Sequence, residues 1–224
     1  MDWPNRYWPK PSPHLHLAYL PSALGVRLRL SVYETDDPEA AVEIDRQFAR
    51  LETLIPDYVI GYGEISLEEA AGALLVERGA SVAVAESCTG GNIAHRFTAH
   101  SGASAYFRGG VVAYANEVKT GLLGVDPQAL AQHGAVSRIV AEQMAEGVRR
   151  ATSATYGLST TGVAGPDGGS PEKPVGAVWM ALATPNGVFA YKRMFGTLRC
   201  ETIQRASSFA INLLRLYLKG RLSE

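Results

Sequence analysis

The chain has few of the residues that build disulfide frameworks or metal centres. Among its 224 residues are two cysteines, Cys88 and Cys200, and five scattered histidines. Two cysteines this far apart fit neither a disulfide framework nor a zinc-ligand spacing. His14 and His16 could share one strand face, but no carboxylate or cysteine lies at ligand spacing beside them. We therefore expect no metal ion and no other cofactor.

Long apolar runs are also missing. The longest are well short of the length that spans a bilayer. The chain does not open with the charged and apolar segments of a signal peptide. We therefore expect a cytoplasmic protein with no membrane partner.

The sequence has no excess of basic residues, and its formal net charge is −1. Residues 1–66 carry 6 Lys and Arg against 10 Asp and Glu, whereas the remainder carries 15 against 12. Non-specific binding to nucleic acids depends on Lys and Arg that neutralise phosphates. The acidic first third also has no Gly-x-x-Gly loop, which weighs against an RNA-binding role. We expect no nucleic-acid partner, although the mildly basic remainder suits a small anion.

The residue pattern divides the chain into three parts. Residues 1–13 are rich in proline and have no periodicity, which indicates a linker or tail. Residues 14–65 combine two strands, an amphipathic helix and a further strand at 57–64, and so predict a small α+β module. A capping box that starts at Ser66 opens the second domain, residues 66–224.

Strands and helices alternate in the second domain. A final hairpin is indicated by Pro185-Asn186-Gly187, and an amphipathic helix ends the chain. This order predicts an α/β fold with three layers, in which helices cover both faces of a mixed, mostly parallel sheet. The expected strands are 80–85, 109–114, 157–163, 175–184 and 187–196, and the expected internal helices are 90–100, 116–123 and 137–151.

Ligands of such sheets bind at the carboxyl ends of the parallel strands. Three loops qualify, at residues 86–91, 115–119 and 160–176. If their strands are parallel, all three loops meet at one edge of the sheet. This edge is where we expect the chemistry.

The first loop, ESCTGG, holds two candidate nucleophiles. Ser87 precedes two glycines that open a helix, where backbone amides and the helix dipole favour negative charge. Ser87 or Thr89 could instead serve only as the helix cap. Cys88 competes, because a helix N-terminus lowers the pKa of a thiol, although a small buried cysteine is the commoner state. The residues alone leave these readings open.

A base for Ser87 is harder to find, because none of the three loops contains a histidine. A desolvated Lys119 could lose its proton near neutral pH and act as one, but an ordinary solvated lysine fits the position as well. The glycine-rich third loop is neither a P-loop nor a dinucleotide fingerprint. Arg199, at the start of the last helix, suits a phosphate, whereas Arg205 suits a surface ion pair.

Four segments together resemble the C-terminal domain of the competence/damage-inducible CinA family. They are ESCTGG, GASAYFRGGVVAYANEVKTGLLGV at 102–125, GAVS at 134–137 and TGVAGPDGGSPEKPVGAVW at 161–179. The resemblance covers about residues 67–218, and that domain is the nicotinamide-nucleotide amidase. Residues 14–65 resemble the small KH-like segment before it. We expect the nucleotide-hydrolase domain that opens longer members to be absent, so its activity is not implied.

The resemblance implies hydrolysis of the carboxamide of nicotinamide mononucleotide to nicotinate mononucleotide and ammonia. Ser87 would be the nucleophile, Lys119 its base, and the protein a homodimer. The alternative is a catalytically silent nucleotide-binding regulatory module of the same fold. The residues that the resemblance implies for substrate binding are Glu86, Thr89, Gly90, Gly91, Tyr114, Asn116, Thr161, Gly162 and Arg199.

Overall fold

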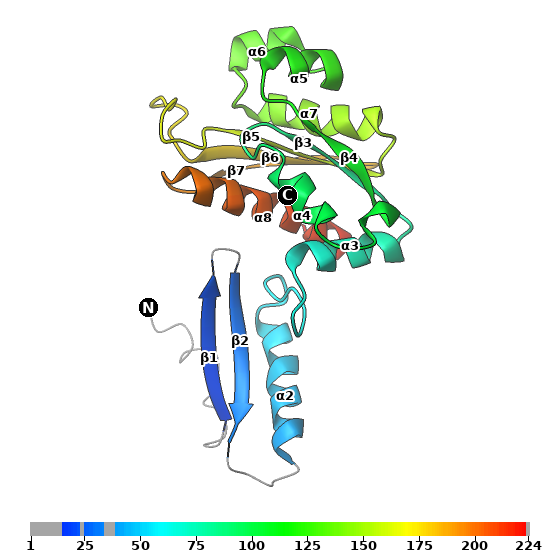
Figure 1. The fold of residues 1–224 in the computed structure, drawn as a ribbon, viewed down its shortest axis with the longest axis vertical. Helices are drawn as coiled ribbons and strands as arrows, with labels where there is room; N and C mark the ends of the chain where they lie inside the picture. The colour runs from blue at the N-terminus through cyan, green and yellow to red at the C-terminus, as the bar shows by residue number, and fades with distance from the viewer. Residues whose placement is uncertain (1–14, 23–24, 34–38, 223–224) are drawn as a thin grey trace. The chain divides into compact units, whose positions relative to one another are not determined.

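The computed structural model describes residues 15–22, 25–33 and 39–222. The chain divides into two compact units, Met1–Ile60 and Gly61–Glu224 (Figure 1). The predicted tail at 1–13 lies outside the described residues. Within the described residues, no helix is both long enough and apolar enough to cross a bilayer.

In its described residues, the first unit contains a strand pair and the helix α2. Strands β1 (Leu15–Ser22) and β2 (Gly25–Val32) pair in antiparallel fashion along their whole length, and α2 (Glu39–Leu54) follows. These elements confirm the predicted strands and helix. The prediction of a strand at 57–64 is wrong, because this segment forms turns. The amides of Tyr58 and Val59 donate to the carbonyl of Ile55 and so are not available for a ladder.

The second unit is built on a five-stranded sheet with the order β4-β3-β5-β6-β7. Strand β3 is parallel to β4 and β5, whereas β6 is antiparallel to both β5 and β7. Four strands therefore run in one direction and β6 runs against them, which confirms a mixed, mostly parallel sheet. The strands are β3 (Val82–Glu86), β4 (Phe107–Val112), β5 (Tyr156–Gly162), β6 (Ala177–Thr184) and β7 (Gly187–Met194).

Helices cover both faces of this sheet (Figure 1). On one face lie α3 (Leu67–Glu77), α4 (Asn92–Thr98) and α8 (Arg199–Leu218); on the other lies α7 (Arg138–Ala151), with α5 (Asn116–Leu123) and α6 (Pro127–His133) beside it. A single 3₁₀ turn, η1, spans Ala103–Ala105. The three predicted layers are confirmed. Helix α6 was not expected, although Asp126 caps it and Pro127 is its first residue, both of which are helix-start signals.

Small residues bring α7 close to the sheet. Ala141 and Ala145 of α7 pack against Ala181 and Ala183 of β6. A Cβ at Gly157 of β5 would lie only 2.1 Å from the carbonyl oxygen of Ala145. Close packing of this kind leaves little room for adjustment. The central strands therefore form a rigid base for the loops at their carboxyl ends.

Candidate active site

The three loops singled out in the sequence meet at one edge of the sheet, because β3, β4 and β5 are parallel. Ser87 directly follows β3, and its amide donates to the carbonyl of Thr160 on β5 at 2.9 Å. On the other side, the amide of Ala113 donates to the carbonyl of Glu86 at 2.8 Å. The predicted convergence of the loops is thus confirmed.

The turn after Ser87 is shaped by Glu86. Gly90 and Gly91 adopt positive φ angles of 63° and 98°, which side chains disfavour. The chain therefore bends back, and the carboxylate of Glu86 accepts the amides of Gly91, Ile93 and Ala94 at 3.0, 3.1 and 2.8 Å. The carboxylate serves as the cap of α4, because the N-cap residue of this helix is Gly91, which has no side chain to cap it. Its charge compensates the positive end of the helix.

This geometry gives Glu86 a structural role, and its contact with substrate stays a prediction. The side chain is 1% exposed, and its carboxylate also accepts the hydroxyl of Thr89 at 2.6 Å. The Thr89 hydroxyl in turn lies 2.6 Å from that of Thr160. Thr89 is 3% exposed, so its side chain also faces inward. Both residues hold the turn in place.

Two backbone donors remain available beside Ser87. In the part of the chain that the structure describes, the amide of Thr89 donates to no other group, and that of Cys88 interacts only with its own thiol. The next amide, that of Gly90, donates to the carbonyl of Ser87 at 3.2 Å. Paired amides next to a nucleophile are the usual donors of an oxyanion hole.

Cys88 is not suited to be the nucleophile. Its side chain is buried, and this burial, with a smaller contribution from the charge of Glu86, raises the pKa of the thiol to about 12. A thiol with this pKa carries almost no reactive thiolate at neutral pH. Ser87 is half-buried, so part of it reaches solvent. Between the two candidates, the geometry favours Ser87.

Lys119 is buried in α5, which rules out the reading as an ordinary solvated lysine. It is 1% exposed, and its Nζ donates to the carbonyls of Ala113 at 2.7 Å and Tyr114 at 3.2 Å. Desolvation by burial lowers the pKa of the amine. A neutral amine has two N–H bonds and one lone pair, and the two carbonyls accept both N–H bonds. The lone pair is then left free to accept a proton.

Lys119 lies near the Ser87 turn but forms no hydrogen bond with the Ser87 hydroxyl in this structure. The charges of Arg199 and Lys119 each oppose the rise in the pKa of the Cys88 thiol, which places both cations near the turn. Among the described contacts, none joins the Ser87 hydroxyl to Nζ of Lys119. Catalytic hydrogen bonds are often long in ligand-free enzymes and shorten when substrate binds.

Arg199 connects the other two loops. It is the first residue of α8. Its guanidinium donates to the carbonyl of Gly165 at 3.0 Å and to the hydroxyl of Tyr114 at 3.4 Å. Both Arg199 and Tyr114 are exposed. A planar cation at this open edge is able to bind an anion such as a phosphate.

The remaining predicted residues lie at the same edge. Asn116 is exposed at the start of α5. Thr161 is 1% exposed and its hydroxyl donates to the carbonyl of Ala135 at 2.8 Å, while a Cβ at Gly162 would lie 2.6 Å from the carbonyl oxygen of Ala177. Their contacts with substrate stay predictions. Arg205 lies 3.7 Å from Glu201 in an exposed pair, which confirms the predicted surface ion pair.

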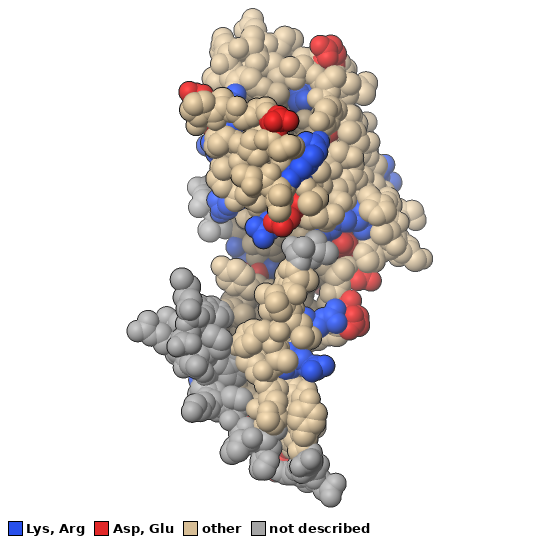
Figure 2. Space-filling model, turned by 60° about the vertical axis from the view of Figure 1, so that its left-hand side comes forward, with Lys and Arg blue, Asp and Glu red and all other residues tan. Residues whose placement is uncertain are grey.

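The surface charges are mixed in the view of Figure 2. Basic and acidic side chains alternate over the face shown, and no broad stripe of one sign follows the described residues there. A mixed surface of this kind gives little long-range attraction for a polyanion on that face. Charge that selects a ligand is therefore local, as at Arg199.

Sequence reasoning missed the contacts that support the site. Thr160 completes the hydrogen-bond chain under the Ser87 turn, and Asn92 of α4 bonds Ser207 of α8. The signal for the second contact was a serine inside the apolar stripe of the last helix. A single sequence does not show which polar residue on another helix faces that serine.

Comparisons with known proteins agree with this arrangement. The model of the CinA C-terminal domain matches residues 64–218. A CinA-like protein of Salinibacter ruber is 50% identical over 179 residues, which are 80% of this chain and 43% of the relative. A CinA-like protein of Cytophaga hutchinsonii is 42% identical over 207 residues, or 92% of this chain and 50% of the relative. The chain thus spans about half the length of these curated relatives.

Solved structures match about seven tenths of this chain over almost their whole length. A competence/damage inducible protein from Agrobacterium tumefaciens is 36% identical with a TM-score of 0.64, covering 71% of this chain and 99% of its own. A CinA superfamily protein from Klebsiella pneumoniae is 30% identical with a TM-score of 0.66, covering 70% and 99%. With a family match over residues 64–218 and relatives of this similarity, the chain belongs to the CinA family.

Proposed function

We propose that this protein hydrolyses the carboxamide of nicotinamide mononucleotide to nicotinate mononucleotide and ammonia. The observation that carries the proposal is the buried Lys119, whose amine is held by two carbonyls beside the Ser87 turn. A buried lysine with a lowered pKa is an unusual feature that fits a general base. The resemblance of the loops to the amidase domain supplies the substrate.

The first half of the reaction acylates Ser87. Its hydroxyl oxygen attacks the carboxamide carbon, and neutral Lys119 takes the hydroxyl proton. The amides of Cys88 and Thr89 donate to the oxygen that becomes negative. As the tetrahedral intermediate collapses, the C–N bond breaks and protonated Lys119 returns its proton to the departing nitrogen. Ammonia leaves and an acyl ester remains on Ser87.

The second half of the reaction releases the acid. Water attacks the ester carbon and gives a proton to Lys119, which is neutral again after the first half. The bond to the Ser87 oxygen then breaks, and that oxygen takes the proton back. The product is the nicotinate mononucleotide, and both catalytic residues return to their starting states.

The other end of the substrate meets the exposed residues of the edge. In this proposal the guanidinium of Arg199, which donates to the Tyr114 hydroxyl, pairs with the phosphate. Arginine suits this role because it is always charged and donates in a fork that matches phosphate oxygens. Asn116, Gly90 and Gly91 are assigned to substrate binding because the resemblance to the family implies it.

The proposal is tested by ammonia release from three substrates measured side by side. Nicotinamide mononucleotide should be hydrolysed fastest, nicotinamide riboside more slowly and free nicotinamide slowest, because the riboside lacks the phosphate and free nicotinamide lacks both the ribose and the phosphate. Release of ammonia from none of them, by protein that binds the mononucleotide, would instead support the silent regulatory module. Equal rates with all three would remove nucleotide recognition from the proposal.

A further inference from the structure

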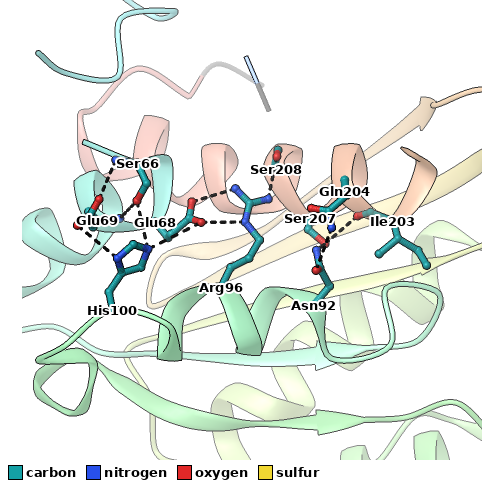
Figure 3. Close-up of polar contacts among 10 residues, drawn as sticks. All are labelled: Ser66, Glu68, Glu69, Asn92, Arg96, His100, Ile203, Gln204, Ser207 and Ser208. Atoms are coloured by element: carbon teal, nitrogen blue, oxygen red, sulfur yellow. Dashed lines mark hydrogen bonds and ion pairs between the residues drawn. The ribbon is translucent and has the colours of Figure 1, made fainter. Parts of the chain in front are cut away.

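Helix α4 is joined to α8 by a short polar seam, formed by Asn92, Gln204 and Ser207 (Figure 3). The side-chain amide of Asn92 donates to the hydroxyl of Ser207 at 2.8 Å, and its oxygen accepts from Gln204 at 3.5 Å. The Ser207 hydroxyl in turn donates to the carbonyl of Ile203 at 2.8 Å. The orientation of Asn92 is thus set by α8.

A second contact one turn further along α4 reinforces the seam. Arg96 donates to both carboxylate oxygens of Glu68 on α3, at 3.0 and 2.9 Å, and to the hydroxyl of Ser208 on α8 at 2.8 Å. The side chains of this ion pair are only 8% and 10% exposed. Such a desolvated, two-pronged pair has a fixed geometry. It holds the second turn of α4, whereas the first turn is held by the Glu86 carboxylate, which accepts the amides of Ile93 and Ala94, and by Asn92.

The first turn of α4 matters because of what lies on either side of the seam. Asn92 directly follows the turn that carries Ser87, and α8 begins with Arg199. Ile93 and Phe97 bury α4 in the core, but apolar burial is not directional and allows small shifts along the interface. Hydrogen bonds are directional. The seam therefore ties the first turn of α4, which follows the Ser87 turn, to residues of α8 that follow Arg199.

We propose that Asn92 is a positioning residue that selects phosphate-bearing substrates by holding the Ser87 turn at a set distance from Arg199. The inference rests on the proposed function, since it needs a substrate that reaches both residues at once. A substrate with its carboxamide at Ser87 and its phosphate at Arg199 depends on that distance. A substrate without phosphate does not.

The test compares kcat/KM for nicotinamide mononucleotide and nicotinamide riboside in Asn92→Ala, Ser207→Ala and the double variant. We expect the preference for the mononucleotide to fall about tenfold in each single variant, the equivalent of one misplaced charge-assisted hydrogen bond. The loss should appear in KM for the mononucleotide, with little change for the riboside. The double variant should lose no more than Asn92→Ala, because both residues act through one bond.

Thr98→Ala is the matched control, since its hydroxyl bonds only carbonyls of its own helix, and it should leave the preference unchanged. An unchanged preference in both Asn92→Ala and Ser207→Ala, or an equal loss on both substrates, would overturn the positioning role while the amidase function stands. If Asn92→Ala does not fold, Ser207→Ala alone decides. A wild-type protein that neither binds nor hydrolyses the mononucleotide would remove the proposed function, and the positioning role with it.

Discussion

Lys119 shows how a single side chain can be prepared for proton transfer by its surroundings. Burial lowers the pKa of its amine, so the neutral form appears at a lower pH than for a free lysine. A cationic pyridinium ring in the site would lower the pKa further, because like charges disfavour the protonated amine. Two carbonyls hold the amine in either state. The fold thus positions the amine of Lys119 and favours its neutral form more than in a free lysine.

We expect Lys119→Arg and Lys119→Ala each to lower kcat/KM for the mononucleotide by several orders of magnitude. Arginine keeps the charge but stays protonated, so it cannot accept the Ser87 proton. Activity of the wild type should rise with pH up to the lowered pKa of Lys119 and then level off. The measurement is a pH profile of kcat/KM for the mononucleotide, together with binding of the mononucleotide by each variant.

Wild-type turnover by Lys119→Arg would show that the lysine acts only as a fixed charge. Residual activity in Lys119→Ala should lack the rising limb of the pH profile. If that limb persisted, another group would be the base.

Ser87 and Cys88 are neighbours with opposite expected roles. Ser87→Ala should lose several orders of magnitude in kcat, as removal of a covalent nucleophile does, whereas Cys88→Ala should keep most of the activity. The high pKa of Cys88 also predicts that a thiol-alkylating reagent at neutral pH modifies exposed Cys200 first. Mass spectrometry of the labelled protein distinguishes the two sites. An inactive Cys88→Ala beside an active Ser87→Ala would reverse the assignment.

Glu86 is expected to contribute to stability as well as to catalysis. In Glu86→Gln the new amide group would face backbone amides that now donate to the carboxylate. We expect a loss of about 1–3 kcal/mol in the free energy of unfolding, measured by urea denaturation, and a fall in kcat. Glu77→Gln, at the exposed end of α3, is the matched control and should change neither. A fully stable Glu86→Gln would show that the carboxylate does not hold the turn.

At the scale of the elements, the local sequence pattern was enough to predict most helices and strands of the second unit. The strands near 82–86, 107–112 and 156–162 and the final hairpin follow from runs of small and β-branched residues between turn signals. The strand expected at 57–64 failed because its residues have strand propensity but their amides are used at the end of α2. Propensity does not supply a partner strand.

The candidate site, too, could be predicted from the sequence only in part. The loops could be placed at one edge because parallel strands bring their carboxyl ends together. The inward orientation of Glu86 and Thr89 could not be predicted, because it depends on how tightly Gly90 and Gly91 turn the chain. The burial of Lys119 likewise comes from the packing of α5 beside α7, residues far apart in sequence.

Helix α8 begins with Arg199, the residue that we expect to bind the phosphate. Arg199→Ala should lower kcat/KM for the mononucleotide by about tenfold or more, since charge-assisted contacts contribute about 1.5–3 kcal/mol. Its effect on the riboside should be small, so the ratio of the two substrates is the measurement. Arg205→Ala on the same helix, which only pairs with exposed Glu201, serves as the control. Equal losses on both substrates would place the phosphate elsewhere.

At the scale of the whole molecule, the chain has two compact units, and every residue of the proposed mechanism lies in the second. The solved relatives that cover 70–71% of this chain are themselves covered to 99%, so a domain of this extent folds by itself in those proteins. The family match also begins only at residue 64. Catalysis and folding of the second unit are therefore expected to be independent of the first.

This independence predicts that a chain beginning at Gly61 keeps the amidase activity. Its kcat and KM for the mononucleotide should lie within about threefold of the full chain, since no catalytic group is removed and the Ser66 capping box that starts α3 is retained. Circular dichroism and thermal unfolding establish that the shortened chain is folded before its rate of ammonia release is compared. A shortened chain that folds and binds the mononucleotide but releases no ammonia would show that residues before Gly61 complete the site. That result would make the first unit part of the enzyme rather than a separate module.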